Sequence, residues 1–122
     1  SKYKSAISNL NSLIMLKPES SKFYFFRGFA NFRLKNYKSA VLDYSKAIEV
    51  QEDKISNLSI YSERGICKMY LNDFKGAISD FNKILTKYTN KEIAKLKKEA
   101  SNNNKYFFFI SIITQNKLKY CK

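Results

Sequence analysis

The sequence predicts an all-α fold of stacked antiparallel helical hairpins: a half-repeat, two full repeats and a helical C-terminal cap. The main observation is an internal repeat, because the glycine, leucine, aromatic, lysine, alanine and aspartate pattern of 28–46 returns at 65–83. The period is the second observation: 34 residues separate Ala6 from Ala40, and 37 separate Ala40 from Ala77. Such a period is typical of helix pairs that bury their apolar faces against neighbouring pairs. One proline and three glycines in 122 residues also permit long helices.

Residues 1–17 are predicted to form the second helix of a truncated repeat. Apolar side chains recur there with helical spacing: Tyr3, Ala6, Ile7, Leu10, Leu13 and Ile14. Pro18 ends the helix, because the residue before a proline avoids the α conformation. Since the first helix of this repeat is missing, we expect Ile7 and Ile14 to be exposed or to make an intermolecular contact. Because the chain starts inside a repeat, we expect it to be a fragment, a processed product or a trimmed version of a longer sequence, in which an upstream targeting signal would not be visible.

Two full repeats are expected at 21–51 and 58–88. In the first repeat, an aromatic-rich helix at 21–34 begins after an N-cap at Ser20 or Ser21. A tight turn at Lys35-Asn36 connects it to a helix at 37–51. In the second, helices at 58–71 and 74–87 are joined by a turn at Asn72-Asp73. The three residues that lengthen the second period fall in a loop at 51–57.

The C-terminal region, 90–122, is predicted to cap the stack, since terminal repeats need an atypical outer face. Residues 90–100 have the pattern of a Lys-rich helix, and Asn102 to Asn104 form a loop. The β-branched and aromatic residues of 105–119 suit a strand, but a lone strand has no partner, so a closing helix is favoured. The apolar segment 106–113 is an alternative occupant of the groove described below. Its longest apolar run is too short to cross a bilayer.

Charge and composition limit the function classes. The net charge is +13, and 83–122 hold ten Lys against Glu92 and Glu99. Only three basic residues are Arg, the residue that most often reads bases, so protein partners are favoured over nucleic acid. The absence of His and of a Gly-rich phosphate loop predicts no enzyme activity, metal or cofactor. Cys67 and Cys121 are not expected to pair, which is compatible with an intracellular reducing compartment.

The repeated residues resemble the tetratricopeptide repeat family over about residues 1–88. The first helix of each repeat has a large residue at Tyr24 and Tyr61, and a small close-contact residue at Gly28 and Gly65. The second helix has a small residue at Ala6, Ala40 and Ala77, and a bulky residue four positions later at Leu10, Tyr44 and Phe81. Pro18 matches the proline of the family pattern. The sequence departs from the family where Arg27 and Arg64 replace Leu, and where Asn31 and Lys68 replace an aromatic residue. Asp43 and Asp80 follow the two arginines by 16 residues, so we predict an Arg–Asp pair within each hairpin; a ligand-reading Arg is the alternative.

The resemblance implies a concave groove lined by the first helix of each hairpin, which takes a peptide or a helix. The positions carried over are Lys22, Phe25, Phe29, Phe32, Arg33, Ser59, Ser62, Ile66, Met69 and Tyr70. Phe25, Phe29 and Phe32 share one helix face, so we expect an apolar groove in a larger scaffold, a co-chaperone-like protein or an assembly factor. A carboxylate clamp for chaperone tails is disfavoured, because Glu63 would repel the carboxylate. The alternative function is a basic structural subunit of a ribonucleoprotein or membrane-associated complex, bound through the Lys-rich end.

Overall fold

The structure, a computed structural model, describes residues 1–50, 57–85, and residues 90, 91, 94, 95 and 98. These residues form helices and connecting turns, without a strand among them. The five named helices are α1 (Lys2–Leu16), α2 (Ser21–Arg33), α3 (Tyr37–Val50), α4 (Asn57–Tyr70) and α5 (Phe74–Leu85). The described positions between 90 and 98 are helical, as predicted for 90–100. Residues 51–56 of the loop expected at 51–57 lie outside the described residues, and Asn57 already belongs to α4. Residues 99–122 of the cap expected at 90–122 also lie outside the described residues.

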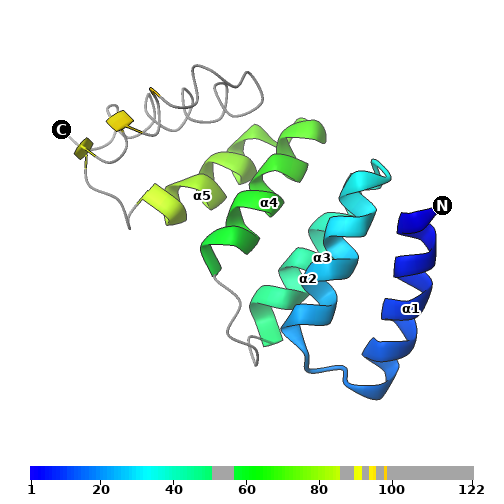
Figure 1. The fold of residues 1–122 in the computed structure, drawn as a ribbon. Helices are drawn as coiled ribbons and strands as arrows, with labels where there is room; N and C mark the ends of the chain where they lie inside the picture. Colours follow the sequence, from blue (N-terminus) through cyan, green and yellow to red (C-terminus); the bar gives the residue numbers. More distant parts are fainter. Residues whose placement is uncertain (51–56, 86–89, 92–93, 96–97, 99–122) are drawn as a thin grey trace.

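The helices stack in the order of the sequence (Figure 1). α2 packs antiparallel on α3 and α4 on α5, and these two hairpins are joined by contacts between α3 and α4. α1 lies against α2 on the outer side of the first hairpin. The predicted stack of a half-repeat and two hairpins is therefore confirmed. No helix in the described part of the chain is long and apolar enough to cross a membrane.

The two hairpin turns have the same geometry. Lys35 and Asn72 have positive φ angles of 64° and 63°. The Asn36 amide donates to the Asn31 carbonyl, and the Asp73 amide donates to the Lys68 carbonyl, both at 2.8 Å. This six-to-one hydrogen bond around a left-handed residue is the Schellman motif, which ends a helix and reverses the chain. The predicted turns at Lys35-Asn36 and Asn72-Asp73 are thus confirmed.

Small residues bring the helices of each hairpin together, as the sequence predicts. A Cβ atom on Gly28 would lie 2.9 Å from Cε1 of Tyr44, and one on Gly65 would lie 2.7 Å from Cε1 of Phe81. These distances are shorter than van der Waals contact, so each aromatic ring rests directly on a glycine backbone. Ala40 and Ala77 are fully buried at the same interfaces.

The core consists of two clusters. The first contains buried residues from α1 to α4: Ile14, Tyr24, Ala40, Tyr44, Ala47, Ile60 and Cys67. The second belongs to the α4–α5 hairpin and contains Ile66, Ala77 and Phe81. Phe32 of α2 packs against both clusters and therefore connects the hairpins.

The structure corrects the prediction for α1. Ile14 is buried in the first cluster and Ile7 is half-buried, so the expectation that both are unusually exposed is wrong. They share the helix face that packs on the following hairpin. The exposed apolar side chains of α1 are instead Leu13, Met15 and Leu16.

Candidate protein-binding surface

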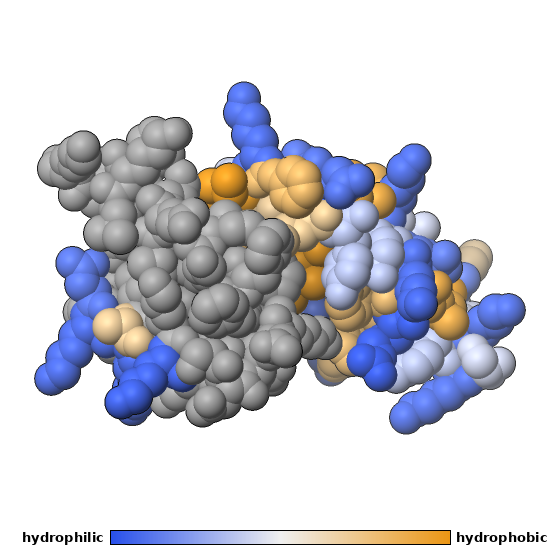
Figure 2. Space-filling view, turned by 90° about the horizontal axis from the view of Figure 1, so that it is seen from above, coloured by the Kyte–Doolittle hydropathy of each residue, from blue (hydrophilic) through white to orange (hydrophobic). Residues whose placement is uncertain are grey.

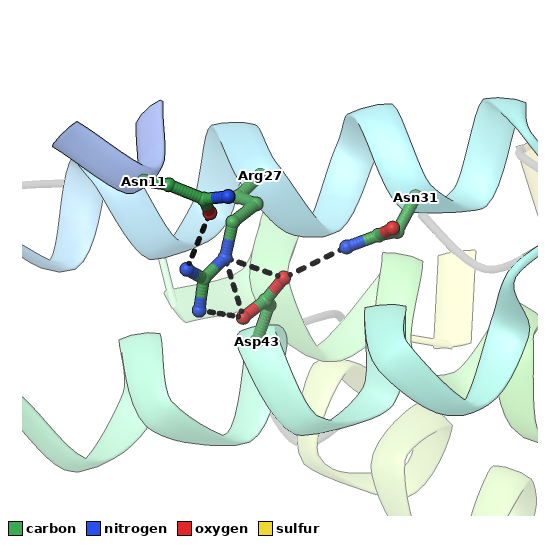
Figure 3. Close-up of polar contacts among 4 residues, drawn as sticks. All are labelled: Asn11, Arg27, Asn31 and Asp43. Atoms are coloured by element: carbon green, nitrogen blue, oxygen red, sulfur yellow. Dashed lines mark hydrogen bonds and ion pairs between the residues drawn. The ribbon is translucent and has the colours of Figure 1, made fainter. Parts of the chain in front are cut away.

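An Arg–Asp network holds the first hairpin to α1 (Figure 3). Nη2 of Arg27 lies 2.7 Å from Oδ1 of Asp43, and Nε lies 3.1 Å from both carboxylate oxygens. Nη1 donates to the side-chain carbonyl of Asn11 in α1 at 2.9 Å. The side-chain amide of Asn31 donates to Oδ2 of Asp43 at 3.0 Å. One guanidinium thus joins three helices.

The second hairpin has an equivalent network. Arg64 donates through Nη2 to Oδ1 of Asp80 at 2.6 Å and through Nε to Oδ2 at 2.8 Å. Its Nη1 donates to the hydroxyl of Ser45 in α3 at 3.1 Å. Nζ of Lys68 lies 3.2 Å from Oδ2 of Asp80. The predicted Arg–Asp pairs are confirmed in both hairpins.

These contacts show that the two arginines have a structural role within the hairpins. Charge-assisted hydrogen bonds to a buried carboxylate engage the fork of each guanidinium. Each guanidinium also lies over an aromatic ring, Arg27 over Tyr24 at 5.6 Å and Arg64 over Tyr61 at 5.4 Å from the ring centroid. The alternative of a ligand-reading Arg is therefore disfavoured.

Several predicted groove residues belong to the core. Ile66 is only 4% exposed and is part of the second cluster, which contradicts its assignment to a binding surface. Phe25, Phe32 and Met69 are half-buried and pack against the clusters, and Ser62 is half-buried as well. Ile66 shares its cluster with Ala77 and Phe81 of its own hairpin, and Phe32 of α2 packs against the same cluster. Phe25 packs against Tyr44 of its own hairpin.

Part of the predicted surface is exposed as a row on α2. Lys22, Phe29 and Arg33 are exposed, and Phe29 retains 41% of its accessible surface. Phe26, which the sequence analysis missed, is 46% exposed and lies between Lys22 and Phe29. The four residues are spaced four, three and four apart, which places them on one helix face. We call Lys22, Phe26, Phe29 and Arg33 the α2 stripe.

Aromatic contacts hold the edges of this surface in place. Phe26 packs against Phe25, with ring centroids 5.9 Å apart. At the other end, Nε of Arg33 donates to the hydroxyl of Tyr3 in α1 at 3.1 Å, and the guanidinium lies 5.7 Å from the centroid of that ring. The α2 stripe is therefore continuous with α1.

Tyr70 lies on α4 and is 54% exposed. Its ring stacks on Tyr37, with centroids 4.6 Å apart and planes 3° from parallel. Phe32 meets both rings edge-on. The predicted surface residue Tyr70 is thus exposed, but one face of its ring is already occupied.

Figure 2 shows long hydrophilic side chains projecting at the periphery of the described part, with apolar residues between them.

Among the described residues, no cluster of His, Cys, Asp or Glu could hold a metal ion. Burial raises the pKa of the Cys67 thiol to about 12, so this thiol stays protonated at neutral pH.

Comparison with known families agrees with this geometry. Residues 21–54 match the family model of the tetratricopeptide repeat. The chain contains a tetratricopeptide repeat. The match covers α2 and α3, and the α4–α5 hairpin repeats the same glycine contact, turn and Arg–Asp network. Tetratricopeptide repeats are protein–protein interaction modules and are generally non-catalytic. No curated protein matches the sequence.

Proposed function

We propose that the chain binds an apolar, mildly acidic segment of a partner protein through the α2 stripe, as part of a larger scaffold, a co-chaperone-like protein or an assembly factor. The observation that carries this proposal is the pair of exposed phenylalanine rings, Phe26 and Phe29, between the cations Lys22 and Arg33. Exposed aromatic side chains surrounded by polar residues are typical of protein-binding sites.

The position of the α2 stripe supports this choice over the wider surface predicted from the sequence. The opposite side of α2 is fixed in the core by Tyr24 and Gly28, so the exposed rings stand on a rigid helix. A preorganised surface loses little conformational entropy on binding. Tyr70 is exposed on the second hairpin and its ring contacts Phe32 of α2. Phe25 packs against Phe26 of the stripe.

The proposal is tested by quantitative affinity capture with the whole chain. Phe26→Ala and Phe29→Ala should each remove the bound partner, because both rings are exposed and their loss leaves the core intact. Leu42→Ala is the matched control, since Leu42 is an exposed apolar residue of α3 that lies outside the stripe. Retention of every partner by both phenylalanine variants would contradict the proposed surface.

The alternative function, a basic structural subunit of a ribonucleoprotein or membrane-associated complex, has one supporting observation. Lys91, Lys95 and Lys98 are exposed and share one helical face. Phosphate binding releases counterions, so affinity for RNA or anionic vesicles should fall linearly with the logarithm of salt concentration. Binding that is unchanged by salt would contradict this function. For either function we propose a reducing compartment, in which the free thiol of Cys67 persists.

A further inference from the structure

We propose that the edge of the stack that carries the two hairpin turns binds a single-stranded nucleic acid, through the stacked rings of Tyr37 and Tyr70 and the lysines around them. The turns at 34–36 and 71–73 lie at the same edge of the stack in Figure 1, and Figure 2 looks down on this edge. We call it the turn edge. The inference goes beyond the proposed function, because it concerns other side chains than the α2 stripe and another class of partner.

The ring pair is a product of the repeat. Tyr37 is the first residue of α3, and Tyr70 is the last residue of α4. Their equivalents one hairpin earlier are Tyr3 and Arg33, which are also in contact, with the guanidinium 5.7 Å from the ring centroid. In both pairs, a ring near the start of one helix carries a planar group from the end of the following helix. The turn edge therefore has flat groups at two successive levels of the stack.

Tyr70 has an open ring face. Tyr37 lies parallel to one face at 4.6 Å, and Phe32 approaches the ring edge-on. The ring is nevertheless 54% exposed, so its second face is accessible in an orientation that its neighbours fix. A base that stacks there continues the stack of the two rings, as bases do on the aromatic side chains of single-strand binding proteins. In a duplex these base faces are hidden, so the occupant is a single strand.

Lysines lie beside the rings. Lys35 belongs to the first turn, Lys38 follows Tyr37 at the start of α3, and Lys75 follows the second turn at the start of α5; all three are exposed. Within the described part of the chain, none of the three has an ion-pair partner. Their charges are therefore available to phosphate groups.

Few carboxylates oppose these charges. Residues 31–42 contain no carboxylate, and residues 67–76 contain only Asp73, whose Oδ1 accepts a hydrogen bond from the Gly76 amide at 3.0 Å. A sequence with this excess of positive charge along one edge attracts polyanions.

The described residues at the opposite edge are more evenly balanced. There, Lys17 is followed by Glu19, and Lys46 forms an ion pair with Glu49 at 3.2 Å. The positive charge is thus not spread uniformly over the two hairpins, and the turn edge is the side that a polyanion approaches.

The chemistry of the edge favours a nucleic acid over an acidic protein segment. Each nucleotide of a strand brings both a phosphate for the lysines and a flat base for the rings, whereas a carboxylate side chain contacts the lysines alone. Lysine binds phosphate as a point charge, and arginine is the residue that reads base edges in pairs of hydrogen bonds. An edge built from lysines and rings therefore holds a strand without reading its sequence.

The experiment measures binding of the whole chain to a labelled oligouridine of about twelve nucleotides by fluorescence anisotropy. The same strand annealed to oligoadenine is the duplex control, and a labelled polyglutamate peptide represents an acidic protein. We expect the single strand to bind more tightly than either control. Its affinity should fall linearly with the logarithm of salt concentration, because phosphate contacts release counterions.

Two substitutions of Tyr70 separate stacking from bulk. Tyr70→Leu keeps an apolar side chain but removes the ring, and should weaken oligouridine binding by about tenfold. Tyr70→Phe keeps the ring and should bind almost as the unchanged chain does. Circular dichroism and the melting temperature show whether each variant retains its fold.

Two substitutions of lysine test the phosphate contacts. Lys35→Gly removes a charge at a left-handed position that glycine tolerates, so a weaker affinity cannot come from unfolding. Lys38→Ala removes the neighbouring charge. Each should reduce the slope of the salt dependence by about 0.7. Lys17→Ala is the matched control, because it removes one exposed charge at the opposite edge, and it should leave the slope unchanged.

Four results would overturn the inference. The first is no binding of oligouridine, or equal binding of the duplex. The second is an affinity that Tyr70→Leu does not change. The third is a loss of binding in Lys91→Ala that Lys35→Gly and Lys38→Ala do not show, which would place the nucleic acid at the Lys-rich end. The fourth is polyglutamate binding that is as tight and that depends on the same residues, which would make the occupant an acidic protein.

Discussion

At the scale of single residues, the departures from the family pattern have one explanation. Arg27 and Asn31 both donate to the same buried carboxylate, Asp43. In the second hairpin, Arg64 and Lys68 occupy the equivalent positions around Asp80. An aspartate buried between two helices needs several donors, because an isolated charge there is strongly disfavoured. The unexpected polar residues therefore act together, because in each hairpin they bind the same buried carboxylate.

The sequence predicted only part of these networks. The regular interval from Arg to Asp identified the pair, since it recurs in both hairpins. The contacts of Arg27 with Asn11 and of Arg64 with Ser45 were not predicted. They depend on how the preceding helix packs against each hairpin, which no local pattern specifies.

We predict unequal effects of removing the two partners in the second hairpin. Asp80→Leu should cost about 3–5 kcal/mol, because it leaves Arg64 and Lys68 without a buried counter-charge. Arg64→Leu should cost less, since Lys68 still neutralises Asp80. The double variant should be more stable than the sum of the single effects predicts. A double-mutant cycle from urea unfolding measures the coupling.

The exposed pair of Lys46 and Glu49 provides the control for this cycle. Glu49→Leu should change stability by less than about 1 kcal/mol, because water screens surface ion pairs. Additive effects of Arg64→Leu and Asp80→Leu would show that the two side chains do not act together.

A second prediction concerns Tyr44. Its hydroxyl is buried and has no hydrogen-bond partner among the described residues, while the equivalent residue in the second hairpin is Phe81. An unsatisfied buried polar group destabilises the folded state, so Tyr44→Phe should stabilise the protein by about 1–3 kcal/mol. Phe81→Tyr is the reverse control and should destabilise it. Melting temperatures measure both effects, and a less stable Tyr44→Phe variant would contradict the assignment.

The same substitution has a pH signature. Burial, followed by the charges of Glu63, Cys67 and Asp43, raises the pKa of Tyr44 well above 10. The folded state therefore keeps a proton that the unfolded state loses, and stability falls as the pH rises above about 10. Tyr44→Phe should reduce this loss in alkaline urea titrations.

At the scale of helices and turns, the sequence was informative because local chemistry determines these features. The apolar periodicity placed the helices, and the described boundaries of α2 and α4 differ from the predicted ones by one residue at most. Pro18 and the two polar turns marked the helix ends correctly. Ser20 is the N-cap residue of α2, as predicted, but its side chain makes no capping hydrogen bond. The prediction for Ile14 failed because the second helix of a repeat has two apolar faces. Ile14 lies on the face that packs against the following hairpin.

The turns give the third prediction. Lys35 has a left-handed backbone conformation, which costs a residue with a Cβ atom about 1–2 kcal/mol. Lys35→Gly should therefore stabilise the protein, by somewhat less than this because glycine also makes the unfolded chain more flexible. Asn72→Gly should stabilise it less, since asparagine tolerates this conformation better. Thermal unfolding of both variants tests the order, and Lys38→Gly, inside α3, should be destabilising.

At the scale of the whole molecule, the exposure of the proposed binding surface could be predicted only in part. Phe29, which the sequence analysis placed on this surface, is exposed. Phe26 was missed because the groove positions carried over from the family include Phe25, Phe29 and Phe32 but not Phe26. Ile66 was included wrongly because it is buried with Ala77 and Phe81 of α5, in a cluster that Phe32 of α2 also contacts. Equivalent positions in a repeat differ in exposure when only one of them has a neighbouring helix.

The last prediction tests how the hairpins are coupled. Phe32 packs against both core clusters, whereas Phe25 packs against the first cluster only. Both rings are half-buried, so each alanine substitution should cost at most about 3–5 kcal/mol. Phe32→Ala should in addition lower the stability of the α4–α5 hairpin relative to α2–α3, because stacked repeats are stabilised by their nearest neighbours.

Native-state hydrogen exchange distinguishes these two effects residue by residue. In the Phe32→Ala variant, the amides of α5 should exchange at a lower free energy than those of α3. In the Phe25→Ala variant, the loss of protection should be largest in α2 and α3. Equal losses of protection in α3 and α5 for both variants would show that Phe32 has no special role in coupling. Coupling would then depend on the contacts between α3 and α4, where Ile60 and Cys67 enter the first cluster.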